Sequence, residues 1–177
     1  MGVDVARFGD DQTVIYRRKG MKVVACKKLS GADTQEVART VWDMADRRRE
    51  VAIKVDDDGV GGGCTDKLRD LGAQVVPVHN GGSPFDEDRF TSCADEQWFG
   101  FAELLDIADI PDDADLMQEL SGRLYSYTRK DQRKVEPKAD FKKRYGHSPD
   151  SADALLLCFY QPQVGYLSDV NASSLGL

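Results

Sequence analysis

Hydrophobic and polar positions in the first fifth of the chain alternate in three short runs. Apolar or β-branched residues recur every second position, and turn residues such as Gly9 and Gly20 separate the runs. This pattern predicts strands joined by short turns, which is typical of an antiparallel meander. The three expected strands cover residues 1–7, 12–18 and 21–28.

The pattern then changes to a helical period. Within residues 32–50, Val37 and Val41 recur at helical spacing, and Asp33 precedes Glu36 by three positions. Because Asp followed three residues later by Glu is a capping-box pattern, we predict an amphipathic helix of about four turns that begins near Asp33.

Strands and helices alternate in the rest of the chain. The continuous apolar run at 51–55 predicts a strand buried on both faces, as parallel strands are. Ser148 and Pro149 predict the start of a final apolar helix, with serine as N-cap and proline at the first helical position. Further expected elements are helices at 65–71 and 86–105, strands at 73–78 and 106–111, a helix or turn at 113–121 and a hairpin at 122–137.

The order of these elements predicts the fold class. A three-strand meander, then a helix, then strands alternating with helices, is the order expected of an α/β, RNase H-like fold with a central mixed sheet flanked by helices. We expect residues 1–162 to form this domain and the small, polar, aperiodic residues 163–177 to form a loose tail.

Acidic side chains stand at three places that this fold brings together. Asp4 lies in the first strand, Asp56 ends the 51–55 strand, and Asp150 and Asp153 share one face of the first turn of the last helix. Like charges at ~4 Å repel by about 4 kcal/mol at an effective dielectric constant near 20. Divalent cations remove this cost, and hard oxygen ligands select Mg²⁺ or Mn²⁺, so we predict a site for two such ions.

The aspartates and glycines at 56–63 leave alternatives open. Strand alternation places Asp56 and Asp58 on one side and Asp57 on the other, but the sequence does not decide which of them contacts metal. The following glycines fit either close approach to phosphate or a tight turn, while Cys64 breaks a GxGxxG reading and no GxxxxGK[ST] is present.

Charge and composition limit the possible partners. The net charge of −7 repels DNA in bulk, so a DNA role depends on bound cations and local basic patches. No apolar run is long enough to span a membrane, and the four cysteines show no metal-binding spacing, so we expect them reduced. The candidate DNA-binding residues lie just before the last helix, where a solvated helix face is the alternative: Lys138, Lys142, Lys143 and Arg144.

Three stretches resemble, in order and spacing, the nuclease domain of the large terminase subunit of tailed bacteriophages. They are "GVDVARFGDDQT", "IKVDDDGVGGG" and "EPKADFKKRYGHSPDSADALLL", and the resemblance covers about residues 2–160. It implies an endonuclease that uses Mg²⁺ or Mn²⁺ to cut concatemeric double-stranded DNA into genome units. By this resemblance the catalytic and metal-binding residues are Asp4, Asp56 and Asp153, with Asp150 as a second candidate in the last helix.

The resemblance also implies partners and a cellular location, and it leaves alternative functions open. The partners would be a terminase ATPase domain, of which this chain shows no motif, together with a small terminase subunit and a portal, in the cytoplasm of an infected bacterium. The rivals are another RNase H-like nuclease such as a Holliday-junction resolvase, a nucleotide-binding module that uses the glycines at 59–63, and a non-catalytic interaction domain.

Overall fold

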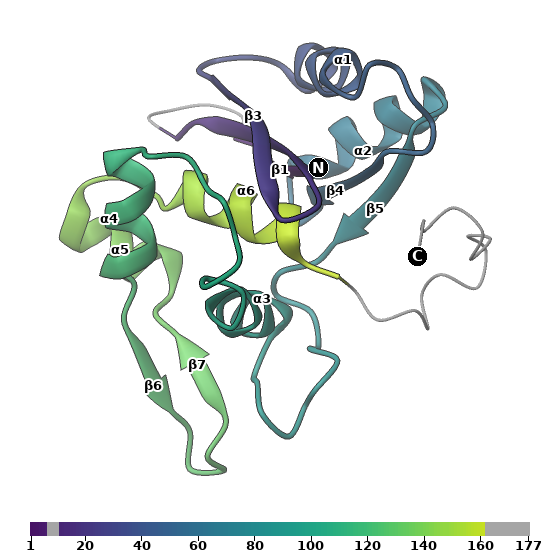
Figure 1. Ribbon diagram of the computed structural model, residues 1–177. Coiled ribbons are helices and arrows are strands. Elements are labelled where there is room, and N and C mark those ends of the chain that lie inside the picture. Colours follow the sequence, from purple (N-terminus) through teal and green to yellow (C-terminus); the bar gives the residue numbers. More distant parts are fainter. Residues whose placement is uncertain (7–10, 162–177) are drawn as a thin grey trace.

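A five-stranded mixed sheet forms the centre of the molecule (Figure 1). The computed structural model describes residues 1–6 and 11–161, so the predicted tail lies outside the described residues. The strands of the sheet follow the order β3-β2-β1-β4-β5, and β6 and β7 form a separate hairpin. Their bounds are β1 Gly2–Asp4, β2 Thr13–Lys19, β3 Lys22–Leu29, β4 Ala52–Asp56, β5 Gln74–Val78, β6 Tyr125–Tyr127 and β7 Arg133–Val135.

The pairing of the strands matches the predicted meander and its parallel extension. β2 pairs antiparallel with both β1 and β3, whereas β4 pairs parallel with both β1 and β5. Along β2 the side chains alternate between two cores, with Ile15 in one and Val14 and Tyr16 in the other. The RNase H-like mixed sheet flanked by helices is therefore confirmed.

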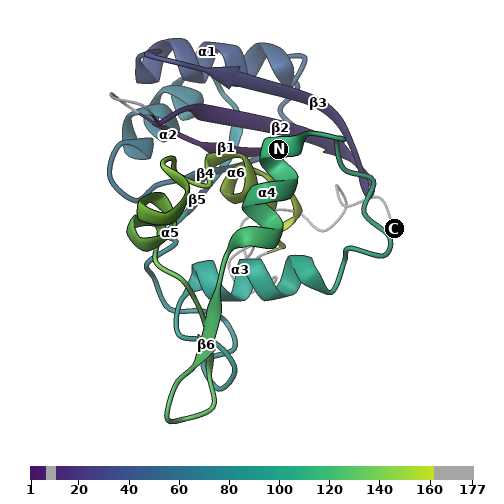
Figure 2. The ribbon, with the colours of Figure 1, turned by 90° about the vertical axis from the view of Figure 1, so that its left-hand side faces the viewer.

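Helices cover both faces of this sheet, as Figures 1 and 2 show. α1 and α2 lie on one face and pack with Val3 and Ile53 in the first core. α6 lies on the other face, with α3 and α4 outside it. The helices span α1 Thr34–Met44, α2 Gly61–Asp70, α3 Cys93–Ala102, α4 Ala114–Gly122, α5 Lys138–Tyr145 and α6 Asp150–Phe159.

Helix α6 is a buried central element and lies directly against β1. Every residue from Ser151 to Phe159 is buried, which agrees with the apolar run in its sequence. A side chain at Gly2 would place its Cβ 2.2 Å from the carbonyl oxygen of Ala154. Glycine in β1 is therefore a condition for this close helix-to-strand contact.

Several predicted boundaries need correction. Helix α2 begins at Gly61 rather than residue 65, because the glycine run forms its first turn. Residues 86–92 are not helical, since two backbone amides of the preceding loop bind Glu96. Residues 106–111 contain only an isolated bridge, from Asp109 to Lys22, instead of a strand.

The start of α6 also differs from the prediction. Pro149 is the N-cap, and no capping side chain from Ser148 bonds the first turn. Glu119 of α4 performs this function, because its Oε2 accepts a 2.7 Å hydrogen bond from the amide of Ala152. A contact between residues so distant in sequence left no local signal.

The free cysteines and the short helices agree with the expectations from the sequence. Cys26, Cys64, Cys93 and Cys158 are all free, and the last three are buried. Among residues 1–6 and 11–161, no helix combines the length and hydrophobicity that a membrane span requires.

Two adjacent glycines allow a matched test of close packing at the start of α2. A Cβ at Gly61 would lie 1.7 Å from the backbone oxygen of Asp56, whereas a Cβ at Gly62 meets nothing within 4 Å. We expect Gly61→Ala to lower the free energy of unfolding by about 2 kcal/mol or more, because backbone must move. Gly62→Ala should raise it by up to about 1 kcal/mol, since alanine favours helix. Urea denaturation of both variants checks this, and equal effects would contradict the packing argument.

Glu119 predicts a pH-dependent contribution to stability. Burial raises its pKa to about 7, a rise to which the nearby Asp150 carboxylate adds. The unfolded chain therefore releases this proton first, so the contribution is present below about pH 4.5 and is lost as the pH rises through 7. Glu119→Gln keeps an acceptor for Ala152 but does not titrate. We expect the variant to gain unfolding free energy relative to the parent across this window, by at most about 3 kcal/mol.

Denaturation from pH 4 to 8 measures this difference. The exposed Glu87→Gln controls for the loss of one carboxylate. A difference between Glu119→Gln and the parent that stays constant with pH would refute a titrating Glu119 in this window.

Candidate active site

Two of the predicted aspartates meet at one edge of the sheet. Asp4 is the last residue of β1 and Asp56 the last of β4, and these strands are parallel neighbours in which Val3 lies opposite Val55. Because parallel strands end at the same edge, the two carboxylates point into a common region. Both residues are buried, at 6% and 9% exposure.

Helix α6 brings the other acidic residues to this edge. Asp150 and Asp153 lie in its first turn, where the helix dipole favours negative charge. Asp153 is 6% exposed. Asp150 also ties the start of β2 to the helix, because its Oδ2 accepts a 2.9 Å hydrogen bond from the amide of Gln12.

The Lys138 ammonium lies among the three predicted catalytic carboxylates. Its Nζ is 2.8 Å from Asp153 Oδ2, 3.5 Å from Asp4 Oδ2 and 4.0 Å from Asp56 Oδ2. Lys138 is the first residue of α5, so four separate elements contribute to one cluster. The structure thus brings together Asp4, Asp56 and Asp153 as the sequence predicts, around a lysine.

Burial and charge perturb the titration of these groups. Desolvation by burial raises the pKa of Asp4 well above its usual range, and the neighbouring carboxylates of Asp153, Asp150 and Asp56 add to the rise. Burial likewise raises the pKa of Asp56. Burial alone would lower the pKa of Lys138, but Asp153 and Asp4 outweigh it and raise that pKa well above its usual range. The Lys138 ammonium opposes the rise in the pKa of Asp4 and of Asp56 but does not cancel it.

The chemistry of this cluster fits a divalent cation. In the described part of the chain, no group of three or more acidic, histidine or cysteine side chains is placed so that it could hold a metal ion as it stands, since the carboxylates surround the ammonium instead. Lys138 and, at Asp153, Arg123 are the cations that face these three carboxylates, and all the ligand atoms are hard oxygens. Asp153 Oδ2 is buried, and its partner is the Lys138 ammonium 2.8 Å away. A cation that binds this oxygen would have to displace the ammonium.

Trp98 and Arg123 hold the other oxygen of Asp153, and sequence reasoning missed both. The Nε1 of Trp98 donates to Asp153 Oδ1 at 3.3 Å, and Nη1 of Arg123 lies 3.6 Å from the same oxygen. The guanidinium also stacks over the indole ring at 4.9 Å. No spacing in the sequence links either residue to position 153.

The remaining aspartates of the 56–58 run have other contacts. Asp57 turns toward α2, where its Oδ1 accepts a 2.6 Å hydrogen bond from the hydroxyl of Thr65. Asp58 accepts a 2.7 Å hydrogen bond from the amide of Gly81 and lies 3.2 Å from His79 Nδ1. Within this run, Asp56 is therefore the residue whose carboxylate lies beside the Lys138 ammonium.

The basic residues predicted to contact DNA have acidic partners. Lys142 binds Asp11 at 2.6 Å, Lys143 binds Asp140 at 2.8 Å, and Arg144 binds Glu136 at 2.6 Å. Lys138 alone of the four lies in the carboxylate cluster. One residue of this stretch therefore lies at the site, and the charges of the other three are partly neutralised.

A cleft opens beside the carboxylates. It has a volume of about 520 Å³ and is bounded by Asp56, Asp153 and Lys138 at one end and by Lys134 of the β6–β7 hairpin at another. Trp98, Gln97 and Asn80 also line it. The cluster is thus reachable from outside along a wall that carries basic and aromatic groups.

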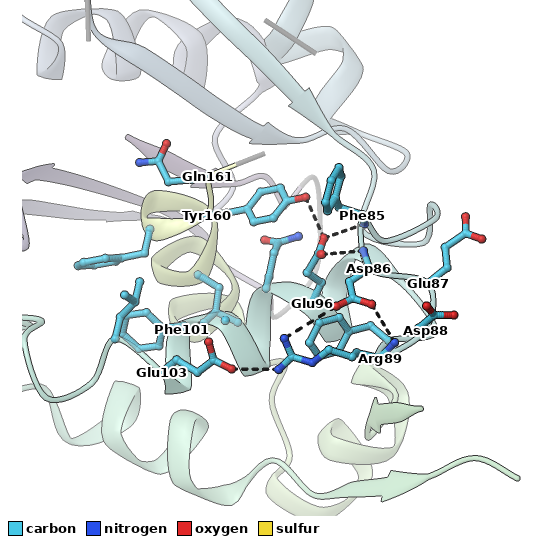
Figure 3. A pocket seen from close by; sticks show the side chains of 16 residues that line it. Phe85, Asp86, Glu87, Asp88, Arg89, Glu96, Phe101, Glu103, Tyr160 and Gln161 are labelled. Atoms are coloured by element: carbon cyan, nitrogen blue, oxygen red, sulfur yellow. Dashed lines mark hydrogen bonds and ion pairs between the residues drawn. The ribbon is translucent and has the colours of Figure 1, made fainter. Parts of the chain in front are cut away.

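A second cavity of about 820 Å³ lies between α3, the 85–90 loop and the end of α6 (Figure 3). Its charged groups are bonded to one another: Arg89 pairs with Glu103 at 3.1 Å, and Glu96 accepts from the amides of Phe85 and Asp86. These contacts hold the loop in place, and Asp4, Asp56 and Asp153 do not line this cavity.

Comparison with known proteins yields structural matches only. No protein-family model and no curated protein sequence matches the chain. Solved structures do match: the nuclease domain of the large terminase subunit gp2 of bacterial virus Sf6 has a TM-score of 0.77 and 21% identity, and the match covers 90% of this chain and 86% of that one.

Two further matches are structures with bound metal. A lysine-to-alanine variant of the Sf6 domain with manganese and beta-thujaplicinol has a TM-score of 0.78 and 20% identity, with 90% of this chain and 86% of that chain covered. The large terminase nuclease from thermophilic phage G20c with magnesium has a TM-score of 0.66 and 18% identity, with 89% and 77% covered. Over about nine-tenths of its length, this chain has the fold of phage large terminase nuclease domains.

Proposed function

We propose that this chain is the nuclease domain of a viral DNA-packaging terminase. In this proposal it hydrolyses the phosphodiester bonds of concatemeric double-stranded DNA, with two Mg²⁺ or Mn²⁺ ions, to release genome units. It would work beside an ATPase domain, with a small terminase subunit and a portal as further partners. Among RNase H-like nucleases, similarity in fold to terminase nuclease domains favours this reading over a junction resolvase.

One observation carries the proposal. Carboxylates from the ends of two neighbouring strands and from the first turn of α6 all lie within 4.0 Å of a single nitrogen, that of Lys138. Burying three negative charges together is costly unless cations compensate them. A fold selected only for stability has no use for this arrangement, whereas a metal-dependent hydrolase requires it.

Each of these residues would have a distinct role in the reaction. Asp4, Asp56 and Asp153 would hold the ions, and Asp150 would add negative charge at the same helix end. Bound divalent ions activate water and stabilise the leaving oxygen of a phosphodiester. Lys138 competes with an incoming cation for the same oxygens, and once displaced it remains close enough to the site to contact a DNA phosphate.

The β6–β7 hairpin is the surface that we expect DNA to follow. It projects from the body of the molecule (Figure 1), and Tyr125 and Tyr127 are 60% and 56% exposed. Among residues 1–6 and 11–161, no ion pair engages Lys130 or Lys134 of this hairpin. Lys134 also lines the cleft beside the carboxylates, so a basic side chain of the hairpin reaches the cleft that contains the site.

The metal site predicts a specific response to manganese. At Mn²⁺ concentrations about 100 times the dissociation constant, binding should raise the unfolding free energy of the parent by about 2.7 kcal/mol. Asp4→Asn should lose most of this gain and the cleavage of linear duplex. Without metal it should be at least as stable as the parent, because burial disfavours the ionised Asp4.

Denaturation with and without Mn²⁺, together with a cleavage assay on linear duplex and four-way junction, measures these effects. The exposed Asp88→Asn is the control for loss of one carboxylate. Absence of any Mn²⁺ effect on the parent would rule out the metal site, and cleavage restricted to junctions would favour a resolvase instead.

The hairpin predicts a salt-dependent change in DNA affinity. Lys130→Glu combined with Lys134→Glu should weaken duplex binding and reduce the slope of log affinity against log salt by about 2, since two phosphate contacts are lost. Lys19→Glu combined with Lys27→Glu makes the same charge change on exposed positions of β2 and β3 and should have a smaller effect. Equal losses in the two double variants, in fluorescence anisotropy titrations, would mean that only net charge matters.

A further inference from the structure

Asp56 is held at both oxygens by neutral donors. Its Oδ1 accepts a 3.1 Å hydrogen bond from the amide of Asp58, and its Oδ2 accepts a 2.8 Å hydrogen bond from the side-chain Nδ2 of Asn80. Asn80 follows β5, the strand that pairs with β4. The carboxylate therefore has a fixed orientation that does not depend on Lys138 alone.

Gln97 sets the orientation of the Asn80 amide. The Nε2 of Gln97 donates to Asn80 Oδ1 at 2.6 Å. Because that oxygen accepts a hydrogen bond from Gln97, the NH₂ group of Asn80 is the end that faces Asp56. If the amide of Asn80 were reversed, its oxygen would lie against the carboxylate and repel it.

The pair is built into rigid structure. Gln97 is 4% exposed and lies in the wall between the cleft and the larger cavity. The loop that carries Asn80 is fixed to the start of α3, since the amide of Ala94 donates to the Asn80 carbonyl at 3.0 Å. The next residue of the same helix, Trp98, bonds Asp153. Helix α3 thus reaches two of the three carboxylates.

We propose that Asn80 and Gln97 form a positioning pair that orients the Asp56 carboxylate for divalent-cation binding. This inference rests on the metal site of the proposed function. A neutral amide fixes a carboxylate without adding a positive charge that would compete with the metal, and such outer contacts typically contribute 10- to 100-fold in metal affinity. Gln97 acts through Asn80 and does not itself touch the ion.

Calorimetric titration with Mn²⁺, in the absence of DNA, tests the pair. Asn80→Ala should weaken Mn²⁺ binding about 10- to 100-fold, and Gln97→Met should weaken it by a smaller factor, roughly three- to tenfold. Methionine keeps the length of glutamine and suits a buried position but donates no hydrogen bond. The exposed Gln118→Met serves as the matched control and should bind Mn²⁺ as the parent does.

A double-mutant cycle separates a relay from two independent effects. If Gln97 acts only through Asn80, adding Gln97→Met to Asn80→Ala should cause no further loss of affinity. Additive losses would overturn the relay. Urea denaturation without metal identifies folded variants, and Gln97→Leu replaces Gln97→Met with the same expected loss if the latter does not fold.

The outcomes distinguish this inference from the proposed function. A parent protein that does not bind Mn²⁺ would overturn both. A parent that binds Mn²⁺, with Asn80→Ala and Gln97→Met within twofold of it, would overturn the positioning pair and leave the metal site intact.

Discussion

Repulsion among buried carboxylates is the constraint on which the rest of this structure depends. Asp4, Asp56 and Asp153 are each less than a tenth exposed, and their oxygens gather around one ammonium. Among the described residues, the cations that face them are the Lys138 ammonium and, at Asp153, the Arg123 guanidinium, so three carboxylates share two positive charges in a poorly solvated place. The fold tolerates this cost at one edge of the sheet, and in the proposed function the electrostatic strain gives the site its affinity for divalent cations.

The scaffold meets this constraint through close packing. Glycine at position 2 lets α6 lie against the start of β1, and glycine at position 61 lets α2 begin against the end of β4 that carries Asp56. Glu119 caps α6 from another helix and thereby holds the turn that carries Asp150 and Asp153. Packing on both faces of the sheet thus fixes the carboxylates before any ligand binds.

The sequence predicted the convergence because it depends on topology. Asp4 and Asp56 end strands that the element order makes neighbours, and Asp153 lies in the first turn of a recognisable helix. The surrounding donors were not predictable in this way. Asn80, Trp98 and Arg123 meet the carboxylates, and Gln97 meets Asn80, only through tertiary contacts among a loop, a helix and a helix end. The α2 boundary was missed because glycines, read as a turn, are helical where packing compensates their weak propensity.

The net charge predicts repulsion of DNA, whereas the lysines of the proposed hairpin surface predict attraction. The distance over which charges act in salt solution decides which effect dominates. The chain carries −7 overall, but at physiological ionic strength the Debye length is about 8 Å, so a phosphate responds mainly to nearby groups. Near the proposed hairpin surface these groups include Lys130 and Lys134, and the cleft beyond them contains Lys138. The acidic remainder of the surface would then repel DNA elsewhere, so that in the proposed function the negative net charge restricts the approach of DNA to the face that carries the site.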